Sequence, residues 1–164
     1  MKSIQPTLTR TFVAAIITAA ALSGFALPIK AETAVTQKNH RPVFKDLPAQ
    51  TKEFIGYADS ISLAPEQQKV KEAVLSTIPA PCCKKFSTAT CCCPCNMAKS
   101  IWGLSNFMLA RHNASAEELR TAVDGWIRVI NPSGFTGDAC DNGGCKRPFA
   151  KNGCAGMDQE HLIF

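Results

Sequence analysis

Hydrophobic residues recur at helical spacing in three segments of the middle of this chain. In the first segment, Val70, Val74 and Ile78 follow one another every four residues, which predicts a helix over residues 65–78. Proline at its first position suits a helix start, and Pro79 cannot continue the helix. We expect this apolar stripe to face a core.

A second stripe has four-three-four spacing and consists of Met97, Ile101, Leu104 and Met108. It predicts a helix over residues 97–112 with Asn96 as its N-cap. Gly103 lies inside this helix, where glycine costs about 1 kcal/mol relative to alanine. We therefore expect another helix to approach closely at Gly103.

A third helix is predicted from the capping box Ser115-Ala-Glu-Glu118 to Ile130. Its apolar face consists of Leu119, Val123, Trp126, Ile127 and Ile130. Only a short connection separates it from the second predicted helix, so the two are expected to be antiparallel neighbours.

The other segments lack a strong period. Residues 32–50 have no apolar period and contain Pro42 and Pro48, which predicts a linker, and residues 51–60 predict a short helical turn. Residues 135–164 are rich in glycine and cysteine and need cross-links or a metal to become ordered. The predicted fold is mainly α: a small three-helix core within a helical domain at 51–134, a cysteine-rich loop, and an irregular tail packed on the domain.

The first residues have the order of a secretory signal peptide. Lys2 and Arg10 precede an apolar run at residues 12–27, and Ala31 offers a small residue for cleavage. The run is 16 residues long, which is short for a membrane span. We expect residues 1–31 to be a signal peptide of a periplasmic or secreted protein without a stable span after cleavage; retention as an anchor stays open.

Charge excludes one class of partner. Three of the 18 basic residues and none of the 13 acidic residues lie in residues 1–31, so the remainder has a net charge of +2. This small charge does not indicate a nucleic-acid surface. No Ser/His/Asp arrangement, phosphate-binding loop or carboxylate pair typical of a hydrolase is present, and whether the chain is an enzyme stays open.

Cysteine is the residue that carries the candidate chemistry. The segment Cys-Cys-Cys-Pro-Cys at residues 91–95 places four thiols in five residues, directly before the second predicted helix. All nine cysteines lie beyond position 81, and in an oxidising compartment thiols tend to pair. Because nine is odd, disulfides alone leave at least one thiol over.

One interpretation is a soft-metal site. Cys91, Cys93 and Cys95 are spaced to share one side of an extended segment, and Cys92 with Cys95 suits a chelating turn. The predicted ligands are Cys82, Cys83, Cys91, Cys92, Cys93 and Cys95. An all-thiolate set selects Cu(I) or Zn(II). This interpretation implies a metal donor or acceptor as partner.

A second interpretation is a redox dithiol of Cys92 and Cys95. Both lie where a helix begins, and the partial positive charge of a helix N-terminus favours thiolate, so Cys92 is expected to be the more reactive. Residues 92–97 resemble the Cys-x-Pro-Cys helix start of thioredoxin. That resemblance implies attack by Cys92, resolution by Cys95 and a redox partner protein, but no buried strand leads into Cys92, so no thioredoxin fold follows.

Residues 91–95 also resemble the motif of small exported bacterial proteins that carry Pro-Cys-Tyr-Cys-Gly-Cys or Cys-Tyr-Cys-x-Cys. In those proteins an amphipathic helix leads into the cysteine motif, as residues 65–78 do here, and further cysteines follow. The resemblance covers residues 65–110. This chain has cysteine in place of tyrosine and inserts residues 82–90. The resemblance implies thiol redox chemistry or metal handling.

The third interpretation is a disulfide-stapled structural or interaction module. Cys140, Cys145 and Cys154 in the tail are the candidates for structural disulfides. Bridges between adjacent cysteines would be strained, so pairing is expected between groups. The favoured hypothesis is an exported thiolate-rich protein that binds or transfers Cu(I) or Zn(II), with the oxidoreductase and the stapled module as alternatives.

Overall fold

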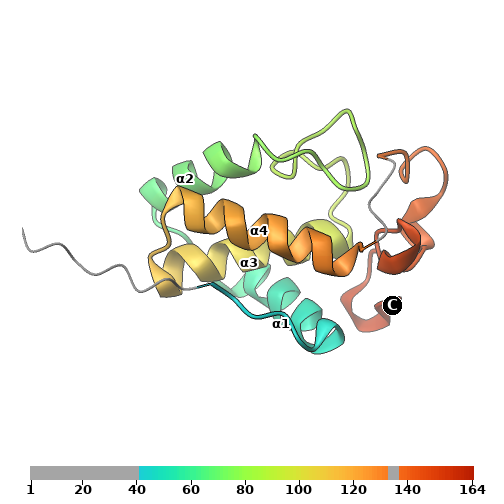
Figure 1. The fold of residues 1–164 in the computed structure, drawn as a ribbon, viewed down its shortest axis with the longest axis horizontal. Coiled ribbons are helices and arrows are strands. Elements are labelled where there is room, and N and C mark those ends of the chain that lie inside the picture. The colour runs from blue at the N-terminus through green and yellow to red at the C-terminus, as the bar shows by residue number, and fades with distance from the viewer. Residues whose placement is uncertain (1–40, 133–136) are drawn as a thin grey trace, which may run out of the picture. The chain divides into compact units, whose positions relative to one another are not determined.

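Four α-helices, α1 to α4, form the core of the computed structural model (Figure 1). The structure describes residues 41–132 and 137–164, which belong to one unit of the chain. The expected signal peptide at residues 1–31 lies outside the described residues. The predicted mainly-α class is confirmed, and among the described residues the only β pairing is an isolated bridge between Pro79 and Ser87.

The first helix, α1 (Leu47–Ser60), is longer than the helical turn predicted for residues 51–60, and it begins inside the predicted linker. The core therefore has four helices where the sequence predicted three. The carboxylate of Asp46 accepts a hydrogen bond from the Ala49 amide at 3.1 Å, which caps the helix. Only Thr51, Phe54 and Ile55 are buried, so the apolar pattern of α1 is too sparse to predict a full helix.

The second helix, α2 (Pro65–Leu75), starts at the predicted proline but ends three residues before the predicted end. The amides of Thr77 and Ile78 bond to Val74 and Leu75 in a tighter turn, which leads into Pro79. Ile78 still lies in the core, 4% exposed. The apolar stripe was therefore identified correctly, although its last residue lies beyond the helix.

The helices α3 (Asn96–His112) and α4 (Ala116–Ile130) follow the predicted pattern closely. The predicted capping box of α4 is present: Glu118 accepts from the Ser115 amide at 2.8 Å, and the Ser115 hydroxyl accepts from the Glu118 amide at 3.3 Å. The prediction of Asn96 as the N-cap of α3 is wrong. The N-cap is Cys95, because the Asn96 side chain is used to hold the tail.

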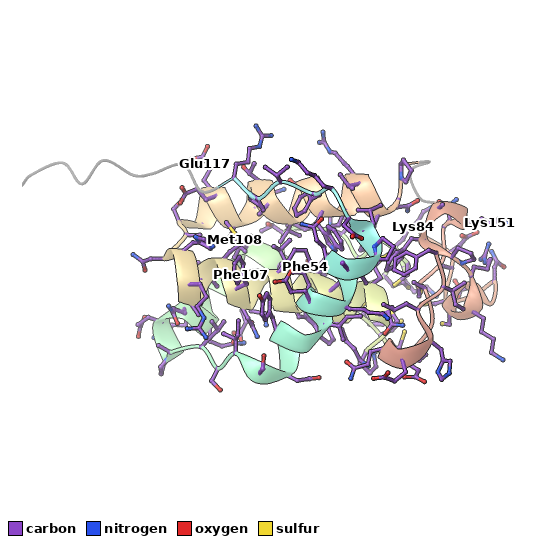
Figure 2. All side chains as sticks on the ribbon, turned by 90° about the horizontal axis from the view of Figure 1, so that it is seen from below. Phe54, Lys84, Phe107, Met108, Glu117 and Lys151 are labelled. Carbon is purple, nitrogen blue, oxygen red and sulfur yellow. The ribbon has the colours of Figure 1, made fainter. Side chains whose placement is uncertain are left out.

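Helix α1 packs against α3 at Gly103, as the glycine in that helix predicted. A Cβ on Gly103 would overlap the carbonyl of Phe54 and would lie 2.8 Å from the backbone nitrogen of Ala58. The side chain of Phe54 then points into the core, with its ring 4.9 Å from that of Trp126 in α4 (Figure 2).

Gly103→Ala is expected to lower the free energy of unfolding by about 3 kcal/mol, because the added methyl group meets backbone atoms that cannot rotate away. Chemical denaturation followed by circular dichroism measures this loss. The matched control is Gly56→Ala in α1, which is exposed and has open space around its Cβ. The control is expected to stabilise the protein by up to about 1 kcal/mol. Equal stability of the Gly103 variant and the wild type would contradict the close packing.

The tail, residues 137–164, packs at the end of the helices where α3 begins (Figure 1). It contains three short 3-10 helices: η1 (Gly144–Lys146), η2 (Phe149–Lys151) and η3 (Gln159–His161). Among the described residues, no helix combines the length and apolarity needed to cross a membrane. The irregular tail was predicted, and its position beside the cysteine-rich loop is what builds the candidate site.

Candidate metal centre

A hairpin-like loop between α2 and α3 brings Cys82 beside Cys91. Thr88 fixes the loop to the end of α2: its amide bonds to the Ile78 carbonyl at 2.8 Å and its hydroxyl to the Leu75 carbonyl at 2.9 Å. The indole of Trp102 in α3 donates to the Thr88 carbonyl at 2.8 Å. The loop is thus held to two helices, and its two cysteine-bearing ends lie together.

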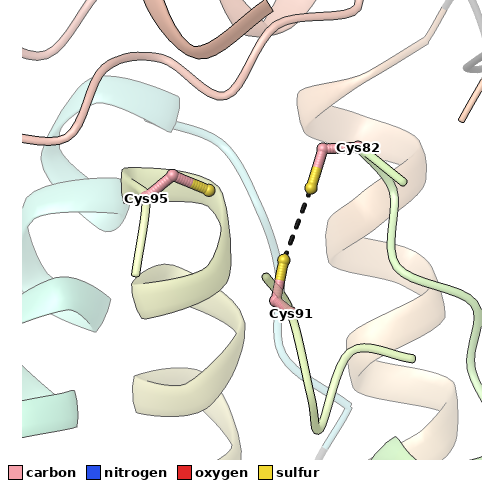
Figure 3. Close-up of side chains that lie close together, drawn as sticks. All are labelled: Cys82, Cys91 and Cys95. Carbon is pink, nitrogen blue, oxygen red and sulfur yellow. Dashed lines mark hydrogen bonds between the residues drawn. The ribbon is translucent and has the colours of Figure 1, made fainter. Parts of the chain in front are cut away.

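Three cysteines, Cys82, Cys91 and Cys95, form a group that we call the inner thiol group. Their Sγ atoms all lie within 4.8 Å of one another, and the Cys82 and Cys91 sulfurs are 3.4 Å apart (Figure 3). Cys82 is 2% exposed and Cys95 is fully buried. Cys95 lies at the first turn of α3, where free backbone N–H groups favour negative charge.

The tail adds a fourth buried thiol, Cys154, to the edge of the inner thiol group. Its thiol is close enough to Cys82 and Cys95 to affect both through hydrogen bonding. The Cys154 carbonyl accepts from the Met97 amide at 3.2 Å, and the Cys154 amide donates to the Gly144 carbonyl at 2.9 Å. Backbone bonds to α3 therefore set the position of this sulfur.

The thiols of the inner thiol group shift one another's pKa values in opposite directions. Hydrogen bonds from the thiols of Cys154, Cys82 and Cys91 hold the pKa of Cys95 far below its ordinary value, and the amide of Ala98 adds to the effect. The pKa of Cys91 is raised by its hydrogen bonds to Cys82 and Cys95 and by burial. The hydrogen bond with Cys154 is the main cause of the raised pKa of Cys82. Within the group, Cys95 is therefore the thiol whose ionisation its neighbours favour most.

A second group, which we call the outer thiol group, consists of Cys92, Cys93 and Cys140, whose Sγ atoms also lie within 4.8 Å of one another. The Cys92 sulfur is 3.0 Å from that of Cys140 and 3.9 Å from that of Cys93. Cys92 is exposed, and the other two are half-buried. Burial, followed by the hydrogen bond with Cys92, raises the pKa of Cys140 to about 12.

The structure distributes the six predicted metal ligands over both groups. Cys82, Cys91 and Cys95 lie in the inner thiol group, Cys92 and Cys93 in the outer one, and Cys83 in neither. The proposed dithiol pair, Cys92 and Cys95, is thus divided between the groups. The structure has no S–S bond between any of the nine cysteines, and the disulfide role expected for Cys140, Cys145 and Cys154 stays a prediction.

The tail cysteines are the site residues that sequence reasoning placed elsewhere. Cys140 completes the outer thiol group and Cys154 adjoins the inner one, although both were proposed as structural disulfide residues. Cys145 belongs to neither group. The sequence did indicate that a glycine-rich tail needs cross-links or a metal to become ordered. It did not indicate which cysteines of the tail lie beside which cysteines of the loop.

The inner thiol group has the spacing that a single soft ion requires. In a tetrahedral site with Zn–S bonds of about 2.3 Å, sulfurs lie about 3.8 Å apart. The Cys82 and Cys91 sulfurs, 3.4 Å apart, are slightly closer than this value, and all three sulfurs lie within 4.8 Å of one another. These clustered cysteines could therefore hold a metal ion with only small side-chain movements.

Asn96 joins the tail to the start of α3, next to Cys95. Its buried side-chain amide donates to the carbonyls of Ala155 at 2.9 Å and Asp158 at 2.8 Å, and its backbone amide donates to Gly156 at 2.9 Å. The amide group thus holds the segment that carries Cys154 against α3.

Asn96→Ala is expected to lower the free energy of unfolding by about 2 kcal/mol, because two carbonyls lose their donor. Amide hydrogen exchange should show the largest loss of protection at residues 154–158. The control is Asn142→Ala, an exposed asparagine of the same tail, for which a change within about 0.5 kcal/mol is expected. Equal effects of the two substitutions would contradict the role given to Asn96.

Comparisons of the chain with protein-family models, curated proteins and solved structures gave no match.

Proposed function

We propose that this chain is an exported thiolate protein that binds a soft metal ion, Cu(I) or Zn(II), and passes it on. One observation carries the proposal: the sulfurs of Cys82, Cys91 and Cys95 lie within 4.8 Å of one another at the start of α3. The three come from two ends of a loop and from a helix N-cap, so the fold assembles them.

The chemistry of the donor set supports a soft ion. Cysteine thiolates select Cu(I) and Zn(II), whereas calcium and magnesium require oxygen ligands. Cys82, Cys91, Cys95 and the adjoining Cys154 would hold the ion, and the ion would replace the thiol protons of the group. The N–H groups at the start of α3 and the thiolate character of Cys95 favour the negative charge that the ligands then carry.

Export is part of the proposal, and it rests on the order of charged, apolar and small residues in residues 1–31. It is tested by expressing the full chain in a bacterial host and measuring the mass of the protein recovered outside the cytoplasm. Cleavage after Ala31 gives a mature chain that begins at Glu32. Recovery of the uncleaved chain in the membrane fraction would instead identify an anchor.

Thiol–disulfide exchange is the second candidate function, and one observation favours it. Cys92 is exposed, and its sulfur lies 3.0 Å from that of Cys140. With an external disulfide as oxidant, the Cys92 thiolate would attack one sulfur of that disulfide and release the other as a thiol. Cys140 would then displace the remaining partner sulfur, leaving a Cys92–Cys140 disulfide and two reduced partner thiols.

The proposed function is tested on one anaerobic preparation that is analysed for metal content and free thiols together. Metal binding predicts at least one equivalent of Cu(I) or Zn(II), together with thiols that become reactive only after a chelator removes the ion. A metal-free protein with a Cys92–Cys140 disulfide that cycles with a reductant would support the redox function. Cysteines locked in bridges that resist mild reduction would leave a stapled module.

A further inference from the structure

The outer thiol group is a built feature of the fold. Cys140 reaches Cys92 from 48 positions away in the chain, and two backbone hydrogen bonds place it there. The Cys140 amide donates to the Cys82 carbonyl at 3.3 Å, and the Lys84 amide donates to the Gly137 carbonyl at 2.8 Å. The loop that supplies a ligand to the inner thiol group thus also anchors the start of the tail.

The two thiol groups are directly linked along the backbone. Cys91 belongs to the inner group and Cys92 to the outer group, and they are adjacent residues. Cys82 links them again, because its sulfur lies in the inner group while its carbonyl holds Cys140. An ion that leaves one group therefore has the other as a neighbouring set of soft ligands.

The groups differ in exposure, and the inner thiol group has a fourth, buried sulfur, that of Cys154, beside it. The inner thiol group is the more enclosed one, since Cys82, Cys95 and the adjoining Cys154 are buried and Cys91 is half-buried. The outer thiol group includes the exposed Cys92 and contains three sulfurs. Structural zinc sites have four protein ligands, whereas sites that exchange a ligand keep a position open. Three thiolates with one side in solvent form a site of the second kind.

We propose that the outer thiol group is a second soft-metal site, at which Cu(I) is exchanged with the thiolates of a partner before it enters or after it leaves the inner thiol group. This inference rests on the proposed function and divides it between two sites. The partner is identified by its chemistry as a thiol carrier of Cu(I), either a small thiol or a cysteine-bearing protein.

The exchange is a ligand substitution without electron transfer. A Cu(I) thiolate complex of the partner approaches Cys92, whose thiolate forms a bond to the ion while a partner thiolate leaves and takes up the proton that Cys92 lost. Cys93 and Cys140 replace further partner thiolates in the same way. The ion keeps its +1 charge throughout, and each bond formed to a cysteine of this chain balances one broken to the partner.

The test uses the mature chain, fully reduced and anaerobic, loaded with Cu(I) supplied as its glutathione complex. Native mass spectrometry gives the number of ions bound, and removal by the chelator bathocuproine disulfonate gives the exchange rate. The wild type is expected to bind one ion in each group. The chelator should remove the ion of the outer thiol group at least about tenfold faster, because the buried surroundings of the inner thiol group limit the chelator's access to its ion.

Variants assign each ion to its group. Cys92→Ser, an exposed substitution, and Cys140→Ser are expected to remove the fast ion and keep the slow one. Cys95→Ser should do the opposite, and Cys145→Ser, in the same tail but outside both groups, should keep both. Cys92→Ser and Cys140→Ser each test the outer thiol group separately, so the fast ion can still be assigned to this group if one of the two variants fails to fold.

The possible failures are distinguishable. If wild-type protein binds a single, slowly removed ion that Cys92→Ser and Cys140→Ser leave unchanged, the outer site is overturned and the proposed function stands. A Cys92–Cys140 disulfide that persists under reduction also overturns the outer site. If no Cu(I) and no Zn(II) bind at all, the proposed function fails as well.

Discussion

Cys95→Ser is expected to weaken binding of Cu(I) or Zn(II) by the inner thiol group by more than about 100-fold. Loss of a residue that only supports a ligand already costs 10 to 100-fold in metal affinity, and Cys95 would be a ligand itself. It is also the residue that the other thiols affect most: Cys154, Cys82 and Cys91 all lower the pKa of its thiol. Serine keeps the size of the side chain but supplies a neutral hydroxyl. Competition with a chromophoric chelator measures the affinity.

Cys83→Ser is the matched control for this substitution. Cys83 is buried like Cys95 and follows Cys82 directly in the chain, but it belongs to neither thiol group. We expect Cys83→Ser to retain wild-type affinity for the metal while losing some stability from burial of a hydroxyl. Equal loss of affinity in both variants would show that the site depends on general folding of the loop, against the assigned geometry.

Removal of the metal is expected to release the tail while the helices stay folded. Through Cys154 the ion would join the tail to the loop and to α3. The free energy of metal binding would therefore stabilise the packed tail against opening. At an ion concentration 1,000 times the dissociation constant, binding contributes about 4 kcal/mol, which corresponds to about a 1,000-fold smaller population of the open form. Trypsin should therefore cut the chelated protein much faster at the exposed Lys146 and Lys151.

The same digest contains its own control. Lys52 is exposed on α1, outside the tail, so its cleavage should change little when the metal is removed. Cys154→Ser should be cut rapidly in the tail with or without metal, whereas Cys145→Ser should still be protected by it. Fast cleavage of the tail in metal-loaded wild type would contradict a role of the ion in holding residues 137–164.

Local sequence patterns account for most of the helical core. Helices α2, α3 and α4 have continuous apolar stripes and clear start signals, so their positions could be predicted within a few residues. Helix α1 was predicted only as a short helical turn at residues 51–60, because it buries only three side chains and depends on α3 for its packing at Gly103. Its start signal, Asp46 followed by Pro48, is short and also typical of a turn.

The candidate site could be predicted only in part. The density of cysteine at residues 91–95 indicated thiol chemistry, and the start of α3 was located within one residue. The division between groups follows from the loop and the tail: Cys91 turns toward Cys82, and Cys92 toward Cys140. Neither contact has a local signal, because each joins segments that meet only after the helices have packed.

The most direct test of a soft-metal centre at the start of α3 is X-ray absorption spectroscopy at the edge of the bound metal, on protein loaded with one equivalent of Zn(II). The thiol geometry predicts a first shell of sulfur alone, at about 2.3 Å, and loss of that shell in Cys95→Ser. A first shell of nitrogen and oxygen, unchanged in Cys95→Ser, would show that the metal binds elsewhere and would overturn the proposed function of the inner thiol group.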